Sequence, residues 1–494
     1  MSGGASPLAR RCAGVLLHPT SLPGGHGNGD LGPDAFRLVD FLQAAGFTVW
    51  QTLPLGPTHD EGSPYRCQSA HAGSELLVSL DRLVADGLLV PDGGPRPGEL
   101  PEAYRRRRLG EAYRAHRSGG HEESRRECRG FAERHRYWLD DHALFQALRE
   151  AQGGRPWWEW PAGLRDRAPA ALEEALATYG DAVDQRRFEQ FVFYRQWGDL
   201  RRYANERGVR VFGDIPLYVA EDSADVWAYR QWFRLDSEGR PTVVAGVPPD
   251  YFSATGQRWG NPQYDWDRLQ ADGFSWWVER LRTQLEQFDL LRIDHFRGLQ
   301  AFWEIPAREQ TAVAGRWVLA PGEALLNRLR EVFRRLPLVA EDLGFITREV
   351  EELRDRFGLP GMKVLQFAFG GGSGNPYLPH NLPVNAVVYT GTHDNDTTLG
   401  WFHSLDQATR DYVLEYLGCA ADAMPAALCR AALASVSRMA VLPMQDLLGL
   451  GSEHRMNVPG THTPRNWRWR FTWEGLAPGT ERLYRRLLEM YGRV

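Results

Sequence analysis

Residues 290–297 read LLRIDHFR, an apolar run that ends in a cluster of charged and imidazole side chains. The first half has the composition of a buried strand, and Asp294 follows at the point where such a strand would end. Seven more runs have the same form, apolar and bounded by Gly, Pro or Asp; they are 13–20, 48–55, 209–216, 337–344, 362–369, 386–394 and 439–448. The chain therefore contains eight candidate strands.

The segments between most of these runs have helical periodicity, as residues 34–46 and 323–336 illustrate. Strands that alternate with helices predict a parallel sheet with right-handed crossovers. Eight of them favour a (β/α)8 TIM barrel over an open sheet, so we predict an α/β protein in which residues 1–494 form a single catalytic barrel. Polar residues at the C-terminal ends of the strands would then surround the active-site mouth.

The regular spacing fails between the second and third strands. Residues 60–190 are rich in charge and mostly helical in pattern, so we predict an inserted, mainly α-helical subdomain there, entered through a Pro/Gly connector at 90–101. The run RRRR at 105–108 is surrounded by Glu and Asp, which indicates a solvated helix face rather than a nucleic-acid site.

Composition excludes several classes of protein. The 494 residues are 43% hydrophobic and 24% charged, and 58 basic against 63 acidic residues give a net charge of −5, which offers no field to attract nucleic acid or an anionic membrane. No run approaches the about 18 apolar residues of a membrane span, and the apolar run near the N-terminus is too short for a signal peptide. Five scattered cysteines without CxxC spacing argue against a disulfide framework or a zinc site. We expect a cytoplasmic protein.

Three acids follow three of the predicted strands: Asp294, Glu341 and Asp394. Each alone is compatible with a helix N-cap or a turn, but together at a barrel mouth they match the carboxylates that glycosidic bond chemistry needs. Arg292, two residues before Asp294, would face the same side and favour the ionised form of a nucleophile. Glu341 lies between apolar residues, where desolvation would raise its pKa and suit a general acid.

Other residues near these acids leave alternatives open. His295 and His393 each flank one acid and are compatible with sugar hydroxyl binding, with a structural role, or with metal ligation, although the spacing of a metal site is absent. Asp342 and Asp396 are expected to be structural. The single lysine, Lys363, could form a Schiff base, but no neighbour in the sequence is expected to activate it.

Aromatic residues make up 12% of the chain and include 18 Trp. Several lie among Pro, Gly, Asn and Ser in two stretches without periodicity, 62–73 and 246–266. We interpret both stretches as loops whose aromatic rings offer flat apolar faces with polar edges, which match the faces and hydroxyl rims of sugars.

Ten motifs, in order from about residue 13 to about residue 470, resemble those of 4-α-glucanotransferase, also called amylomaltase or disproportionating enzyme, of glycoside hydrolase family 77 in the α-amylase clan. They are GVLLHPTSLPG, GDIPLYVAEDSADVW, GVPPDYFSATGQRWGNPQYDW, RIDHFRG, AEDLG, MKVLQFAF, NPYLPHN, YTGTHDNDTTLGW, MQDLLGLGSEHRMNVPG and NWRWR. The resemblance implies a barrel with inserted helical subdomains and no C-terminal β-domain. It also implies retaining transfer of α-1,4-glucan segments without metal or organic cofactor.

The resemblance implies a role for each matching residue. Asp294 takes the place of the nucleophile, Glu341 that of the acid/base, and Asp394 that of the carboxylate that grips the donor sugar. The remaining matches are substrate contacts: Arg292, His295, His393, Tyr65, Asp214, Tyr251, Phe252, Trp259, Asn375, Pro376 and His380. Residues 246–266 resemble a loop that covers the substrate. The expected partners are maltooligosaccharides, amylose, starch or glycogen chains, with glucose as an acceptor.

The chain departs from the family pattern in two places. Family members continue SPYQSFSAFAGNP where this chain reads SPYRCQSAHAGSE, so Cys67, His71 and Ser74 are atypical. His26 and Asn28 stand where an aromatic and an apolar residue are common. These departures bear on acceptor preference and product length. The alternatives to a transferase are a retaining α-glucan hydrolase with the same acids and a carbohydrate-binding protein without catalysis.

Overall fold

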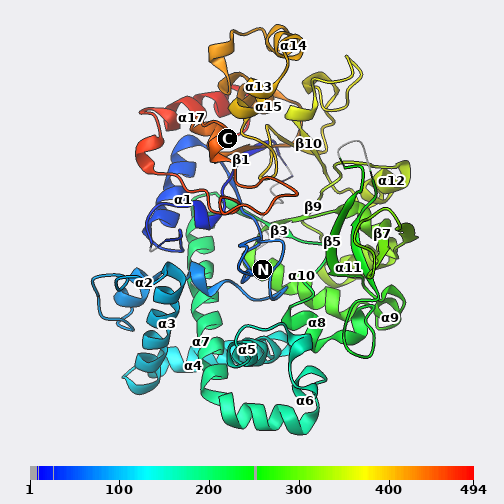
Figure 1. The fold of residues 1–494 in the computed structure, drawn as a ribbon. Coiled ribbons are helices and arrows are strands. Elements are labelled where there is room, and N and C mark those ends of the chain that lie inside the picture. Colours follow the sequence, from blue (N-terminus) through cyan, green and yellow to red (C-terminus); the bar gives the residue numbers. More distant parts are fainter. Residues whose placement is uncertain (1–7, 9, 26, 250–252) are drawn as a thin grey trace.

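An eight-stranded parallel sheet forms the centre of the chain, in a computed structural model that describes residues 8, 10–25, 27–249 and 253–494 (Figure 1). Its strands follow one another in the order β10-β11-β12-β1-β2-β3-β6-β9. Their bounds are β1 (Cys12–Leu16), β2 (Val49–Gln51), β3 (Arg210–Ile215), β6 (Leu290–Ile293), β9 (Leu338–Ala340), β10 (Gly361–Val364), β11 (Ala386–Tyr389) and β12 (Met439–Pro443).

The two ends of this order, β9 and β10, lie side by side, because the amide of Ala340 donates to the carbonyl of Pro360 at 2.9 Å. The sheet therefore curls into a nearly closed barrel, and the predicted (β/α)8 architecture is confirmed with all eight predicted strands. The strands are buried along almost their whole length. Burial on both faces explains why each of them reads as an uninterrupted apolar run.

Helices surround the barrel (Figure 1). The helix after β1 packs against the last helix of the chain, which joins the two ends of the fold. The connection from β10 to β11 contains no α-helix and consists of loop with 3₁₀ turns at Leu365–Phe367 and Pro379–Asn381. The helices outside the insertion are α1 (Pro33–Ala45), α8 (Ala224–Ala228), α9 (Trp266–Ala271), α10 (Ser275–Gln287), α11 (Gly322–Phe333), α12 (Arg348–Arg356), α13 (Thr398–Ser404), α14 (Gln407–Leu417), α15 (Ala426–Ala434), α16 (Met444–Leu447) and α17 (Thr480–Met490).

The long connection from β2 to β3 is helical and lies on one side of the barrel, in the lower part of Figure 1. It contains α2 (Leu80–Ala85), α3 (Pro101–Ser118), α4 (Glu122–Arg134), α5 (Arg136–Ala151), α6 (Ala162–Arg165) and α7 (Pro169–Glu206). The last of these, α7, has 38 residues and continues past residue 190 without a break until it contacts β3. Its Gln190 and Gln196 side chains each bond both the amide and the carbonyl of one residue in the incoming chain, Gly73 and Ser79 respectively.

The arginine run 105–108 differs from the expected solvated face. Arg105 is 1% exposed and Arg108 is 6% exposed. Arg105 forms an ion pair with Asp30 at 2.9 Å and donates to the carbonyls of Val78 and Asn28. The prediction is wrong for these two arginines because carboxylate and carbonyl partners replace water: Asp30, Val78 and Asn28 at Arg105, and Glu111 and Val90 at Arg108.

A second, antiparallel sheet of four strands lies beside the barrel, in the order β5-β4-β7-β8. The sequence did not indicate it. Residues 257–262, expected to be part of a loop, form the strand β5, so that prediction is wrong for these residues. Because β5 is an edge strand, it tolerates the Gly and Pro residues that made the segment resemble a loop. The strand bounds are β4 (Val243–Val247), β5 (Gln257–Pro262), β7 (Ala301–Pro306) and β8 (Arg316–Leu319).

The chain after β12 forms no further sheet. Residues 444–494, all of which the structure describes, contain α16, α17 and 3₁₀ turns and no strand. The main hydrophobic core extends from the barrel and its surrounding helices into the helical insertion, where Trp138, Phe145 and Phe188 belong to the same buried cluster.

Gly213 in β3 offers a test of how closely this layer is packed. A Cβ atom at this position would lie 2.4 Å from the ring of Phe288, so Gly213→Ala forces the ring or the strand to move. We expect Gly213→Ala to lower the free energy of unfolding by about 1–3 kcal/mol, measured by denaturant titration. The matched control is Gly180→Ala in α7, where nothing lies within 4 Å; it should stabilise by about 0.5–1 kcal/mol. Equal stability of the two variants would contradict this description of the packing.

Candidate active site

Three carboxylates extend from the C-terminal ends of three barrel strands. Asp294 follows β6, Glu341 follows β9, and Asp394 lies five residues after β11. Two of them are linked through the backbone, because the amide of His295 donates to the Glu341 carboxylate at 2.8 Å. The sheet order makes β6 and β9 neighbours, so the end of one strand meets the end of the other.

Arg292 connects the nucleophile candidate to the barrel interior. It lies directly opposite Asp214 in the pairing of β6 with β3, and its Nη1 contacts Asp214 Oδ2 at 2.6 Å. Its Nη2 contacts Asp294 Oδ1 at 2.8 Å. The phenol of Tyr65 donates to Asp214 Oδ2 at 2.7 Å. Burial lowers the pKa of Arg292, but the charges of Asp214 and Asp294 outweigh burial and hold that pKa well above its usual value. Arg292 is therefore a permanent cation between two acids.

Glu341 has the environment of a proton donor. Burial raises the pKa of Glu341 to about 7; Arg292 opposes this shift, and the charge of Asp294 adds to it. Two backbone amides, those of His295 and Leu343, donate to the two carboxylate oxygens at 2.8 and 3.0 Å. These bonds fix the orientation of the carboxyl group. Its neighbour Asp342 is buried and instead binds Arg354 and the amide of Met362, as expected for a structural acid.

Asp394 has the opposite environment. Its side chain is 47% exposed in the mouth, where Asn457 Nδ2 donates to Oδ1 at 2.7 Å and His393 Nε2 lies 3.4 Å from Oδ2. Partial removal from water raises the pKa of Asp394, but the charge of His393 and the hydrogen bonds from His393 and Asn457 prevail and set it to about 2. Asp394 is thus a carboxylate at any pH near neutrality. Asp396 binds Ser452 and the amide of Thr397, which fits the structural role expected for it.

Aromatic rings line both sides of this mouth. The Tyr65 ring stacks on His393 with centroids 5.0 Å apart, and Trp467 lies 5.9 Å from His393. On the other side, Trp259 from β5 meets His295 edge to face at 4.8 Å. These rings offer apolar faces beside the acids.

His295 has an unusual backbone. Its φ of 52° lies in the left-handed region, which non-glycine residues rarely adopt without a functional reason. This conformation turns the His295 amide toward Glu341. Burial lowers the pKa of His295 to about 4, so the imidazole is neutral, and its Nε2 has no hydrogen-bond partner among the described residues.

The other predicted substrate contacts divide into two groups. Asn375, Pro376 and His380 lie in the loop after β10, where Asn375 donates to the carbonyls of Phe367 and Gly370 and His380 contacts Tyr416; the structure does not join them to the three acids. Tyr251 and Phe252 lie outside the described residues.

The structure also brings in residues that the sequence did not single out. Asn457, Arg455 and Trp467 come from the chain after β12, and His18 follows β1. Their position after barrel strands was the available signal, since the carboxyl ends of all strands meet at one face. Their separation from the acids in the sequence gives no spacing that would identify them.

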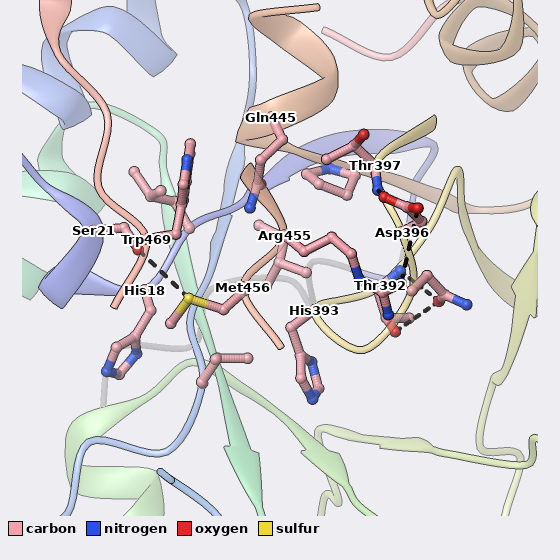
Figure 2. A pocket seen from close by; sticks show the side chains of 15 residues that line it. His18, Ser21, Thr392, His393, Asp396, Thr397, Gln445, Arg455, Met456 and Trp469 are labelled. Carbon is pink, nitrogen blue, oxygen red and sulfur yellow. Dashed lines mark hydrogen bonds and ion pairs between the residues drawn. The ribbon is translucent and has the colours of Figure 1, made fainter. Parts of the chain in front are cut away.

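A small cavity lies beside His393, at the ends of β1 and β12 (Figure 2). Its volume is about 30 Å³, enough for a water molecule. His18 lines it together with Gln445 and Met456. Burial lowers the pKa of His18 to about 3, so this histidine is neutral, and its Nδ1 has no partner among the described residues.

Comparison with known proteins identifies the family. A family model described as 4-alpha-glucanotransferase matches residues 17–476. The chain belongs to this family. The 4-alpha-glucanotransferase of Thermus thermophilus is 52% identical over 481 residues, which cover 95% of this chain and 96% of that protein. The enzyme of the same name from Synechocystis is 47% identical and covers 98% of this chain and 99% of its own. The resemblance predicted from the motifs is confirmed.

A solved structure agrees with this 4-alpha-glucanotransferase family assignment, and a more distant one shows the same fold. The amylomaltase from Streptococcus agalactiae, in complex with acarbose, superposes with a TM-score of 0.93 at 35% identity and covers 98% of this chain and 100% of its own. The amylomaltase from Corynebacterium glutamicum shares the fold, with a TM-score of 0.76 at 19% identity; the match covers 98% of this chain and 76% of that one.

Cys67, His71 and Asn28, at which the sequence departs from the expected family pattern, each contact other residues of this chain. His71 is buried, contacts Thr283 at 3.0 Å and stacks on Trp138 of the insertion. Cys67 contacts the carbonyl of Pro64, next to Tyr65, and burial raises the pKa of its thiol to about 12. Asn28 donates to the carbonyl of Leu76, and His26 lies outside the described residues.

No group of three or more His, Cys, Asp or Glu side chains among the described residues is arranged to hold a metal ion. Likewise, none of the described helices is long and apolar enough to cross a membrane.

The pKa of Glu341 predicts the pH dependence of the site. If Glu341 must be protonated to act, kcat/KM should fall above the pKa of about 7, by about tenfold per pH unit. Asp394, with a pKa of about 2, does not titrate near neutral pH and should leave the pH profile unchanged there. The pH profile of kcat/KM on maltotriose measures this. Glu341→Gln should lose the alkaline limb and about 10²- to 10⁴-fold in rate. A wild-type profile that stays flat well above this pKa would contradict the role of Glu341.

Proposed function

We propose that the chain is a retaining 4-α-glucanotransferase. It moves α-1,4-glucan segments from a donor maltooligosaccharide or starch chain to the 4-hydroxyl of an acceptor glucan or glucose. The observation that carries the proposal is the pairing of two unlike carboxyl groups: Asp294 forms an ion pair with Arg292, and Glu341, which accepts from the amide that follows Asp294, has its pKa raised by burial to about 7. Retaining transfer needs one carboxylate and one carboxylic acid at the same bond.

In the first step, an Asp294 oxygen attacks the anomeric carbon of the donor sugar. The glycosidic C1–O4 bond breaks as the Asp294–C1 bond forms, and Glu341 gives its proton to the departing oxygen. The part of the donor that carries this hydroxyl leaves. Arg292 contacts both Asp294 and Asp214, so the Asp294 carboxylate stays in place while it loses its negative charge and becomes an ester.

In the second step, the acceptor's 4-hydroxyl attacks the same carbon from the opposite direction. Glu341, now a carboxylate, takes the hydroxyl proton, and the Asp294–C1 bond breaks as the new C1–O4 bond forms. Two inversions restore the α configuration. One glycosidic bond is broken and one is formed, so the reaction balances without oxidant, reductant or metal.

Asp394 stabilises the reacting sugar from the side in this proposal. As a carboxylate held by Asn457, it accepts hydrogen bonds from the sugar hydroxyls next to the anomeric carbon and favours the flattened, positively charged ring of the transition state. His393, Tyr65 and His295 surround the same ring. Further sugars extend toward Trp259 on the acceptor side and toward the loop of Asn375, Pro376 and His380.

The balance between transfer and hydrolysis depends on the acceptor. A hydrolase with the same acids would let water attack in the second step. The proposal assigns residues 246–266, including Tyr251 and Phe252, to a segment that covers the substrate, excludes water and holds the acceptor. Trp259, a half-buried residue of this segment, contacts His295, the residue that follows Asp294.

The product ladder from maltotriose tests the proposed function. We expect glucose together with maltooligosaccharides longer than the substrate, because the intermediate is intercepted by a sugar hydroxyl. Chromatography of the products over time measures the ladder. Glucose and maltose alone, with no longer chains, would identify a hydrolase and contradict the proposal.

Asp294→Asn tests the covalent step. The amide keeps the size of the side chain but is a poor nucleophile, so we expect transfer activity to fall by at least about 10³-fold while acarbose binding, measured by calorimetry, is retained. The matched control is Asp267→Asn, an exposed acid in the first turn of α9, which should leave activity unchanged. An active Asp294→Asn enzyme would exclude Asp294 as the nucleophile, and a wild-type protein that binds but never transfers would be a binding protein.

A further inference from the structure

Arg455 connects the two segments that present Asp394 and its hydrogen-bond partner Asn457. Its Nη2 donates to the backbone carbonyl of Asp394 at 2.9 Å, and its Nε donates to the carbonyl of Asn457 at 3.2 Å. Its Nη1 lies 3.8 Å from the carboxylate of Asp396. One guanidinium group thus reaches the acid, the residue that binds the acid, and a second acid in the same turn.

The planar shape of the guanidinium gives these contacts their value. Arginine presents its donors in a fixed plane, whereas the lysine ammonium is a single point with freely rotating donors. Because the backbone carbonyls of Asp394 and Asn457 both accept hydrogen bonds from the same planar guanidinium group, the distance between their main chains is fixed. The Asn457 side chain is 8% exposed and reaches Asp394 Oδ1 at 2.7 Å from this fixed base.

Asp396 holds the guanidinium from the other end. Its carboxylate accepts from the hydroxyl of Ser452 at 2.8 Å and from the amide of Thr397 at 2.8 Å. Figure 2 shows Arg455 extending toward the turn that carries Thr392 and Asp396, beside His393. Within this turn, the amide and hydroxyl of Thr392 both donate to the side chain of Asn395. The turn is therefore bonded internally and to the segment 452–457.

We propose that Arg455 is a positioning residue for Asp394: it sets the distance between the Asp394 and Asn457 main chains, and thereby the orientation of the carboxylate toward the donor sugar. In this proposal Arg455 acts through Asp394 and Asn457, whose main chains it contacts, and not through the substrate. This inference rests on the proposed function, because it assigns Asp394 to the donor sugar, and it adds a residue of the C-terminal segment to the machinery of that site.

A purely structural role predicts a different outcome. If Arg455 only stabilised the fold, its removal would lower the melting temperature and leave the kcat of the folded enzyme unchanged. A positioning role predicts that kcat falls, because Asp394 acts in the transition state, while KM for maltotriose changes little.

The test compares four variants of the full chain by kcat and KM on maltotriose and by amide hydrogen exchange of residues 390–397. Arg455→Ala should lose roughly 10- to 100-fold in kcat and exchange faster in this segment. Arg455→Lys keeps the charge but not the plane, so it should recover part of the loss. Asp396→Asn keeps the shape of the side chain but removes the charge that faces Arg455, so its kcat should fall several-fold. This variant replaces Arg455→Ala in the test if Arg455→Ala does not fold. The matched control is Arg410→Ala in α14. Arg410 also donates to two backbone carbonyls, those of His403 and Leu405, but these lie outside the segments 390–397 and 452–457, so the variant should keep the wild-type kcat.

Two results would overturn the proposal. One is a folded Arg455→Ala or Asp396→Asn enzyme with wild-type kcat and unchanged exchange in 390–397. The other is an Arg455→Lys enzyme with full activity, since a point charge would then suffice. Failure of the proposed function can be told apart from failure of this inference. If the proposed function were wrong, the wild-type protein would give no transfer products, and amide hydrogen exchange of residues 390–397 would still show whether Arg455 holds this turn.

Discussion

The ion pair of Arg292 with Asp214 and Asp294 is the interaction on which the site depends. Arg292 is 6% exposed and Asp214 is 2% exposed, so both charges have left water. Breaking such a buried pair by removing one partner typically costs about 3–5 kcal/mol, because the remaining charge is left uncompensated. The barrel register places Arg292 directly opposite Asp214. The order of the strands therefore determines the position of Asp294, and through the next amide that of Glu341.

Glu341 and Asp394 titrate very differently, although the charge of Arg292 lowers the pKa of both. Glu341 has a pKa of about 7 and Asp394 a pKa of about 2, although both belong to one mouth. Burial dominates at Glu341, whereas a neighbouring histidine and an amide donor dominate at Asp394. One mouth thus contains a carboxyl group with a pKa of about 7 and a permanent anion. The difference arises from what each loop supplies after its strand ends.

Much of the fold and part of the site could be predicted from the sequence, and the reasons differ between elements. Strands such as 290–293 are buried on both faces, so their apolar runs were unambiguous, and Asp294 and Glu341 stood out as acids directly after them. Residues 257–262 were misread as loop because an edge strand tolerates Gly and Pro. Arg105 was misread because burial of an arginine depends on tertiary partners such as Asp30. Asn457 and Arg455 lie in a motif that resembles the family, but their contacts with Asp394 could not be predicted, since these contacts span more than sixty residues and depend on the barrel closing.

Helix α7 bears on how far the insertion is a separable module. The chain enters the insertion from β2 through loop, but it returns to the barrel inside one helix of 38 residues, about 57 Å long. No hinge exists at the return, because the hydrogen-bond ladder of α7 runs from the outer helices to β3. Gln190 and Gln196 also bind the incoming chain as a neighbouring strand would. The insertion therefore cannot be removed by cutting the chain in a loop at each of its two junctions with the barrel. At the second junction the cut would fall within α7, whose C-terminal end packs against β3, the strand that carries Asp214.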